Sequence, residues 1–208
     1  MILTGLAPDP RRPDYRLVEL DRGRFASLPA ESLAGLDLVV GSEIAPLVFE
    51  RLQELADLEA AHRAALRALA RRAHARFDLR RRLLQKQHPP AAVDGALDRL
   101  SAAGLLNDGQ FALDYAAAKA RRGRGPVRLM RDLQSQGVDR RVAEDAVRHS
   151  LAAEGVDPAR AVRALAEKRA KQLAALPPVV RKRRLVAFLV RRGFTGGEVR
   201  EVVESLNS

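Results

Sequence analysis

The feature of this sequence that most constrains its fold is a spacing of core positions that occurs three times. Steps of 4, 5, 5 and 4 residues separate the members of each copy, which are Leu79, Leu83, His88, Val93 and Leu97, then Leu129, Leu133, Val138, Ala143 and Val147, then Leu185, Leu189, Phe194, Val199 and Val203. A four-residue step places two side chains on one helical face, and a five-residue step fits a turn into a second helix. Each copy therefore predicts a helix, a tight turn and another helix.

Residues that end and begin helices support these boundaries. The turn contains Gly137 in the second copy and Gly193 in the third, and glycine ends a helix in the left-handed conformation at little steric cost. Pro126 and Pro158 stand where the first residue of a helix is expected. The expected side-chain caps are Asn107 (with Gln110), Asp139, and Thr195 (in a capping box with Glu198).

Each predicted helix pair has a further helical stretch before it. These stretches cover residues 46–73, 110–122 and 159–174, so that each pair becomes a three-helix unit. The units follow one another at intervals of 50 and then 56 residues. We therefore predict an all-α fold of three tandem three-helix repeats that stack into a curved, elongated solenoid. The predicted repeats comprise residues 46–106, 107–156 and 157–208.

The first 45 residues are expected to hold a lead-in and a short β-hairpin. Residues 1–12 are rich in Pro, Gly and Asp, which favours a mobile segment with little capacity to form a core. Tyr15, Leu17 and Leu20 lie before a turn signal at Asp21-Arg22-Gly23, and apolar residues follow it. A lone hairpin is marginally stable in water, so this one would have to pack against the helices that follow.

Composition excludes several classes of function. The chain is 47% hydrophobic but only 4% aromatic, and it has no Cys, which excludes disulfides, thiolate nucleophiles and cysteine zinc sites. No apolar run is long enough to span a membrane, and residues 1–13 do not form a secretory signal, so we expect a cytoplasmic protein. The four His residues lack metal-site spacing, and Gly123-Arg124-Gly125 is not part of a nucleotide-binding loop. We therefore expect a protein that is not an enzyme and that binds neither a cofactor nor a metal ion.

Charge is distributed unevenly along the chain. Residues 1–62 carry 6 Lys and Arg against 11 Asp and Glu, a net charge of −5, whereas residues 63–208 carry 31 against 15, a net charge of +16. A basic excess of this size indicates a polyanionic partner such as nucleic acid, or a protein already bound to one. The alternative is an Arg-rich proteome that places Arg on every solvated helix face.

The cations form three clusters, each just before or within the first helix of a predicted pair. The middle cluster is Lys119, Arg121, Arg122, Arg124, Arg128 and Arg131; the first is Arg76, Arg80, Arg81, Arg82 and Lys86; the third is Arg181, Lys182, Arg183, Arg184, Arg191 and Arg192. The candidate binding residues are the whole middle cluster, Arg76, Arg80 and Arg81 of the first, and Lys182, Arg183 and Arg184 of the third. We expect Arg121, Arg122 and Arg124 to be exposed.

The order of several motifs resembles a known family. GLLND, FA..Y, GRGP and L..QGV follow one another between Ala96 and Val138, after ALRALARRAHARFDLRRRLL and before RLVAFLVRRGF. This sequence is similar to the RecX family of bacterial regulators of the recombinase RecA, roughly over residues 60–206. The first unit departs from the family pattern, because Gln87-His88 replaces a Gly and a large apolar residue, and Ala75 replaces a Ser that would cap a helix.

The resemblance implies a small helical protein without an active site. It implies binding along the groove of RecA filaments on single-stranded DNA, with weaker binding to duplex DNA as a further option. Such a protein restrains filament growth, ATP hydrolysis, strand exchange and the co-protease role of RecA, and so acts in DNA repair and the SOS response. We expect a monomer that does not bind membranes.

Two other classes of function remain open. A sequence-specific DNA-binding regulator is the main alternative, because the unit from Leu129 to Val147 resembles a helix-turn-helix element. Its second helix, however, mixes acids and bases without an evident set of base-reading residues. A helical scaffold for acidic protein partners is the other class. An enzymatic function has no residues to support it.

Overall fold

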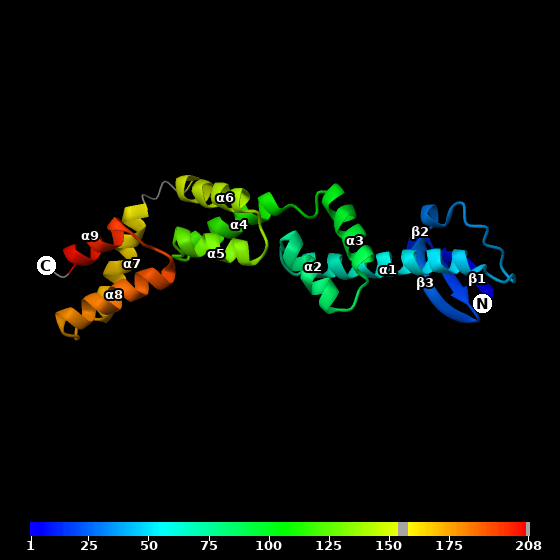
Figure 1. The fold of residues 1–208 in the computed structure, drawn as a ribbon, viewed down its shortest axis with the longest axis horizontal. Helices are drawn as coiled ribbons and strands as arrows, with labels where there is room; N and C mark the ends of the chain where they lie inside the picture. Colours follow the sequence, from blue (N-terminus) through cyan, green and yellow to red (C-terminus); the bar gives the residue numbers. More distant parts are fainter. Residues whose placement is uncertain (154–157, 207–208) are drawn as a thin grey trace. The chain divides into compact units, whose positions relative to one another are not determined.

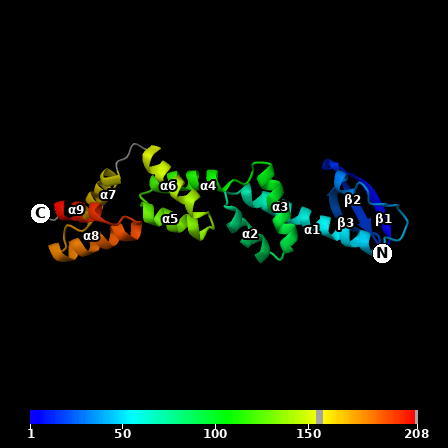
Figure 2. The same ribbon diagram turned by 45° about the horizontal axis from the view of Figure 1, so that its top comes forward.

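The computed structural model describes residues 1–153 and 158–206 (Figures 1 and 2). A small sheet at the N-terminus precedes the helical part. The sheet consists of β1 (Leu3–Asp9), β2 (Arg12–Leu20) and β3 (Gly23–Pro29), and a short 3-10 helix follows, η1 (Ala30–Leu33). The α-helices are α1 (Pro46–Leu69), α2 (Arg76–Gln85), α3 (Pro90–Ala102), α4 (Asp108–Ala120), α5 (Pro126–Ser135), α6 (Arg140–Ala153), α7 (Pro158–Gln172), α8 (Pro178–Arg192) and α9 (Gly197–Ser205).

The chain divides into two compact units. The first unit comprises Met1–Ala73 and Leu79–Leu106, and the second comprises His74–Asp78 and Asn107–Ser208. The helices fall into three groups of three in chain order, α1–α3, α4–α6 and α7–α9, which confirms the predicted repeats. The predicted curvature of a stacked solenoid and the predicted limits of each repeat stay predictions.

The corner between the two helices of each pair has the same backbone geometry in all three repeats. A residue with positive φ stands at the corner: Gln87 at 64°, Gly137 at 79° and Gly193 at 92°. The N–H of the next residue donates to the carbonyl five residues earlier, at 3.3 Å from His88, 3.2 Å from Val138 and 3.1 Å from Phe194. This is the Schellman arrangement, which satisfies carbonyls at the helix end. The predicted turns are confirmed, including the one without glycine.

Each repeat has its own apolar core at the predicted positions. Of the fifteen residues in the three copies of the spacing, all are buried except His88, which is half-buried. The first helix of each repeat packs against the pair through fully buried alanines, such as Ala61 in α1, Ala112 in α4 and Ala166 in α7. The small side chain lets the helices approach closely, which explains how an Ala-rich sequence with few aromatics fills these cores.

The predicted hairpin forms and packs where it was expected. β2 and β3 pair antiparallel around Asp21 and Arg22, whose φ angles of 47° and 63° are those of a tight two-residue hairpin turn. The sheet buries Leu3, Val18 and Leu28 against the first half of α1, around Leu52. The second half of α1 belongs to the core of the first repeat. This one helix therefore joins the sheet to the helical body of the first unit.

The prediction of a mobile lead-in over residues 1–12 is wrong, because this segment contains β1. β1 pairs with β2 in the order β1-β2-β3, and a register shift between Leu3 and Gly5 lets the edge strand follow the twist. The N–H of Leu3 also donates to the carbonyl of Ser42 at 3.1 Å. Pro8 is tolerated because an edge strand has unpaired positions. Hydrogen bonds from distant residues, which composition does not reveal, order this segment.

Two of the three predicted side-chain caps are present. The Asn107 side chain accepts a hydrogen bond from the N–H of Gln110 at 3.0 Å, and Asp139 accepts one from the N–H of Arg141 at 2.8 Å. The capping box at Thr195 is wrong, because α9 begins one residue later than that box requires. Gly196, with φ of 99°, is the N-cap and no side chain caps the helix.

Within the second unit, the start of α5 meets the end of α8. The N–H of Gly125 donates to the carbonyl of Arg192 at 2.7 Å, and the N–H of Val127 donates to that of Gly193 at 3.2 Å. Helix starts leave such N–H groups without intrahelical partners, and helix ends leave such carbonyls. A Cβ on Gly125 would lie 2.5 Å from the carbonyl oxygen of Gly193, so the two backbones touch directly. We call this contact the glycine joint.

We predict that Gly125→Ser destabilises the second unit. The φ of Gly125 is −81°, which any residue adopts, and Ser is a favoured N-cap residue, so neither factor would cause a loss. The added Cβ would instead collide with the backbone of Gly193, at a cost of about 1 to 3 kcal/mol. Urea unfolding followed by circular dichroism measures this change.

Gly197→Ser is the matched control in the same unit. Gly197 also lies at a helix start, but a Cβ there meets no atom within 4 Å. Its unfolding midpoint should stay close to that of the parent chain. Equal stability of the two variants would show that the glycine joint is not a close contact in solution.

Candidate nucleic-acid interface

The middle cationic cluster lies where α4 ends and α5 begins. Arg121 and Arg122 are exposed in the turn that follows α4, as predicted. The ammonium group of Lys119 lies 5.5 Å from the centre of the Tyr115 ring. Cations at the C-terminal end of a helix complement its dipole, so part of this cluster also stabilises α4. These side chains are nevertheless placed where a polyanion could reach them.

A single carboxylate holds two arginines of this cluster. Asp132 forms ion pairs with Arg124 and with Arg128, whose Nε lies 3.0 Å from Oδ1. Arg124 also donates a hydrogen bond to the hydroxyl of Tyr115 at 3.1 Å. Burial raises the pKa of Tyr115, and the negative charge of Asp132 raises it further. The expectation that Arg124 is fully exposed is wrong, because these two partners leave only 34% of its side chain exposed.

Five arginines from two repeats line one cleft in the second unit. The cleft has a volume of about 580 Å³ and lies between α5 and α8; we call it the arginine cleft, and its lining residues are Arg124, Val127, Arg128, Arg131, Val190, Arg191, Arg192 and Gly193. Arg131 and Arg191 are exposed, and within the described residues neither forms an ion pair. Two guanidinium groups therefore face solvent without a neutralising acid, as phosphate binding requires.

Arg191 and Arg192 were not among the residues selected from the sequence. Arg192 donates a hydrogen bond to the carbonyl of Arg122 at 2.9 Å, and its guanidinium lies 5.2 Å from the centre of the Phe188 ring. The two arginines reach the middle cluster only because the glycine joint brings the end of α8 against α5. The sequence offered one signal for this, the Arg-Arg pair directly before Gly193.

Four members of the third cluster, residues 181–184, lie in the first half of α8, and its other two members, Arg191 and Arg192, end this helix. Lys182, Arg183 and Arg184 are exposed, as a binding role requires, whereas Arg181 is half-buried. Cations near the start of a helix oppose its dipole, so this run lowers the stability of α8 slightly.

The first cluster is partly committed to contacts within the protein. Arg80 binds Asp94 through two hydrogen bonds, Nε to Oδ1 at 2.6 Å and Nη2 to Oδ2 at 3.0 Å. Arg76 is half-buried, and its backbone N–H donates to Asp108 at 2.7 Å. Arg81 is exposed. Arg80 thus links α2 to α3, which reduces the charge that it offers to a partner.

The aromatic rings near the middle and third clusters are not offered for base stacking, whereas Phe77 beside the first cluster is 53% exposed. Phe111 and Phe194 are buried in the cores of their repeats, each 6% exposed. The Phe188 ring has the guanidinium groups of Arg169 and Arg192 over it, at 5.5 and 5.2 Å. The residues that line the arginine cleft are therefore cations, valines and a glycine, which suit backbone contacts better than base contacts.

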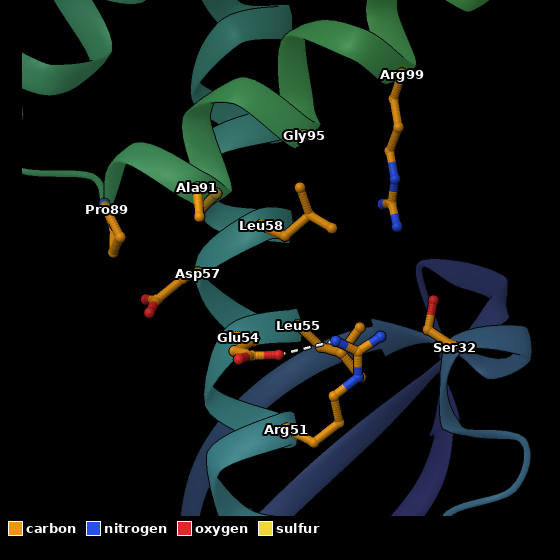
Figure 3. A pocket seen from close by; sticks show the side chains of 11 residues that line it. Ser32, Arg51, Glu54, Leu55, Asp57, Leu58, Pro89, Ala91, Gly95 and Arg99 are labelled. Atoms are coloured by element: carbon orange, nitrogen blue, oxygen red, sulfur yellow. Dashed lines mark hydrogen bonds and ion pairs between the residues drawn. The ribbon is translucent and has the colours of Figure 1, made fainter.

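The first unit contains a different hollow that the sequence did not indicate. Figure 3 shows Leu55 and Leu58 of α1 beside Gly95 of α3, around a volume of about 420 Å³. Arg51 and Glu54 form an ion pair of 2.8 Å at its rim, so their charges cancel. An apolar floor with a neutral rim does not suit a polyanion. Close packing at Gly95, where a Cβ would lie 3.1 Å from Leu58, shapes the hollow.

Two of the histidines, His62 and His74, lie wholly or partly inside the protein. His62 is half-buried on α1, and burial lowers its pKa. His74 is buried, and its Nδ1 lies 2.8 Å from Asp78 Oδ2. Across residues 1–153 and 158–206, no three His, Cys, Asp or Glu side chains are grouped to hold a metal ion. No helix of the described chain combines the length and apolarity needed to cross a membrane.

Comparison with known proteins links all three repeats to one family. Family models for the first, second and third three-helix domains of RecX match residues 61–100, 107–147 and 157–203. The regulatory protein RecX of Halorhodospira halophila is 38% identical over 144 residues, which cover 68% of this chain and 85% of that protein. The regulatory protein RecX of Pseudomonas savastanoi pv. phaseolicola is 38% identical over 136 residues, covering 65% and 84%.

Two solved structures have a similar fold. A crystal structure of regulatory protein RecX superposes with a TM-score of 0.76 at 18% identity, covering 98% of both chains. The crystal structure of RecX from Lactobacillus salivarius superposes with a TM-score of 0.60 at 21% identity, covering 73% of this chain and 97% of that one. At these identities the likeness concerns the fold alone.

We predict that Asp132→Asn lowers stability but strengthens binding to single-stranded DNA. The amide would lose the charged hydrogen bonds to Arg124 and Arg128, which costs about 1 to 2 kcal/mol. The arginine cleft would gain one net positive charge close to the bound phosphates. Urea unfolding and fluorescence anisotropy with labelled oligo(dT) measure the two effects.

Asp145→Asn is the control, since Asp145 pairs with Arg148 at the surface of α6 with 60% of its side chain exposed. An exposed pair contributes at most about 1 kcal/mol, so this variant should change little. Weaker DNA binding by Asp132→Asn would indicate that the carboxylate orients the two arginines for phosphate, and would contradict the expected gain.

Proposed function

The chain belongs to the RecX family, and from this we propose that it binds RecA filaments on single-stranded DNA and lowers the activity of RecA. The curated relatives are named regulatory proteins, which supports a regulator. In this proposal the protein slows filament growth, ATP hydrolysis, strand exchange and the co-protease function by occupying the filament. It acts by binding, as a monomer in the cytoplasm, and contributes to DNA repair and the SOS response.

The arginine cleft is the observation that carries this proposal. It gathers Arg131 and Arg191, which are exposed and lack ion pairs within the described chain, next to arginines that Asp132 and Phe188 hold in place. Guanidinium groups without an acid partner can each donate two hydrogen bonds to a phosphate, which suits Arg131 and Arg191 to this role. Arg121 and Arg122 lie in the preceding turn and extend the positive surface.

The chemistry of the cleft favours a DNA backbone held in a protein filament over free bases. The described cleft has aliphatic residues, Val127 and Val190, where a base-reading surface would have aromatic rings. Contacts to phosphate do not depend on the base sequence of the DNA. An inhibitor of RecA needs this property, because RecA filaments form on single strands of any sequence. Weak binding to duplex DNA follows from the same contacts.

The alternative of a sequence-specific regulator has less support. In the second repeat, α6 would be the recognition helix, yet two of its three arginines are paired along the helix. Arg140 bonds Glu144 at 2.7 Å, and Arg148 bonds Asp145 at 3.1 Å. A recognition helix presents such side chains to base edges instead. High-affinity binding to one duplex sequence, without an effect on RecA, would favour this alternative.

The central test is RecA-dependent ATP hydrolysis on single-stranded DNA. Titration with this protein should lower the rate, and the variant Arg131→Gln with Arg191→Gln should inhibit less. If each arginine neutralises one phosphate, the slope of log K against log salt should become less steep by about 1.4 in the double variant. Neutral Gln leaves the cleft uncharged at these positions without adding repulsion.

The control is the double variant Arg148→Gln with Arg163→Gln, which removes the same charge from exposed positions away from the cleft. It should inhibit as the parent protein does. Unchanged ATP hydrolysis at several-fold excess of the parent protein would refute the proposed function. Equal inhibition by both double variants would show instead that the cleft is not the contact surface.

A further inference from the structure

A stripe of valines runs along α8 beside the cationic residues. Val179, Val186 and Val190 are spaced by seven and four residues, which places them on one helical face. Val179 is 81% exposed and Val190 is 50% exposed, whereas Val186 is partly buried. In the described structure no other element covers the two ends of this stripe. Exposed apolar rows of this kind often mark sites that contact a partner.

The stripe borders a groove between α8 and α9. The groove has a volume of about 360 Å³, and we call it the valine groove; its lining residues are Lys182, Val186, Val190, Thr195, Gly196, Val199, Arg200, Val203 and Glu204. Four valines from two helices form its floor. Gly196 and Gly197 at the start of α9 leave the groove open, since a Cβ on either would meet no atom within 4 Å.

Charge at the rim indicates the kind of partner. Lys182 and Arg200 are exposed at the rim, against the single acid Glu204. Val190 is shared with the arginine cleft, where Arg191 adds a further exposed cation. The apolar floor thus lies between cations on several sides. An acidic segment with apolar side chains complements such a surface, because its carboxylates meet the cations while an apolar side chain leaves water.

A nucleic acid would complement the groove less well. Phosphates would contact Lys182 and Arg200 but would leave the valine floor exposed to water. Bases bind by stacking on aromatic rings, and the residues that line the groove include none. The arginine cleft, in contrast, contains five guanidinium groups and only two valines. The two hollows therefore differ in the ligand that each fits.

We propose that the valine groove docks an acidic protein segment that carries apolar side chains, next to DNA bound in the arginine cleft. The inference rests on the proposed function, in which the partner is a protein filament with DNA inside. One apolar side chain of the segment enters between α8 and α9, and carboxylates beside it pair with Lys182 and Arg200. Because Val190 lines both hollows, the protein segment and the DNA would bind next to each other on one surface.

The test uses the full chain with Val179→Asp and Arg200→Glu. Both positions are exposed, so the variant should fold, and an Asp near the start of α8 favours the helix dipole. The matched control, Leu47→Asp with Arg148→Glu, has the same change in net charge. Leu47 is 77% exposed and, like Val179, it is the residue after a proline that begins a helix. Neither variant alters the arginine cleft.

Binding is measured to RecA assembled with ATPγS on labelled oligo(dT), and to the same oligonucleotide without RecA. The groove variant should bind filaments about tenfold more weakly than the control, because Arg200→Glu repels the docked carboxylates at the rim and Val179→Asp removes apolar contact at the end of the valine stripe. The two variants should bind the naked oligonucleotide alike. Equal filament binding would overturn the proposal, and weaker binding of the groove variant to naked DNA would assign the groove to nucleic acid.

A peptide probe makes the inference independent of RecA. One labelled peptide is rich in Asp and Glu and has Leu at every fourth position, and its partner has Ser at these positions. The parent protein should bind the Leu peptide about tenfold more tightly than the Ser peptide, and the groove variant should bind the Leu peptide more weakly than the parent protein does. No preference would overturn the inference. If the parent protein prefers the Leu peptide but does not bind RecA filaments, the docking role of the valine groove is upheld and the proposed function is refuted.

Discussion

The left-handed residue at the helix corner is the constraint on which each repeat depends. It reverses the chain so sharply that the next N–H donates to the carbonyl five residues earlier, and in the second and third repeats the apolar side chain of that next residue, Val138 or Phe194, closes the core. With the corner fixed, the spacing of 4, 5, 5 and 4 residues places the core side chains between the two helices of the pair. Gln87 adopts this conformation with φ of 64° at a cost of about 1 kcal/mol. The core of the first repeat, with Leu83 and Val93 fully or almost fully buried, outweighs that cost.

The corner of the third repeat also builds the candidate interface. Because Gly193 has no side chain, its carbonyl can accept the N–H of Val127, and Gly125 can lie against it. This contact brings the last residues of α8 beside the first turn of α5. Arginines far apart in the sequence, such as Arg124 and Arg192, then line one cleft. The interface is thus a consequence of how two backbones meet.

The parts of the structure that periodicity governs could be predicted from the sequence, and the parts that tertiary contacts govern could not. The helix pairs, the hairpin turn at Asp21 and the cap at Asn107 depend on residues close in sequence. β1 was missed because its order comes from β2 and from Ser42, not from its own composition. The pairing of Arg124 with Asp132 and Tyr115 was missed for the same reason, since charge counting does not tell which cations are already paired.

Five guanidinium groups in one cleft would repel each other, and the structure shows how three of them are held. The single carboxylate of Asp132 pairs with both Arg124 and Arg128, and Arg192 lies over the Phe188 ring and donates a hydrogen bond to the carbonyl of Arg122. These contacts keep the cleft walls in place without covering its mouth. Arg131 and Arg191 then carry most of the available charge. A surface so arranged binds strongly only where a polyanion spans both, and the adjoining valines add affinity only for a partner that also presents apolar side chains.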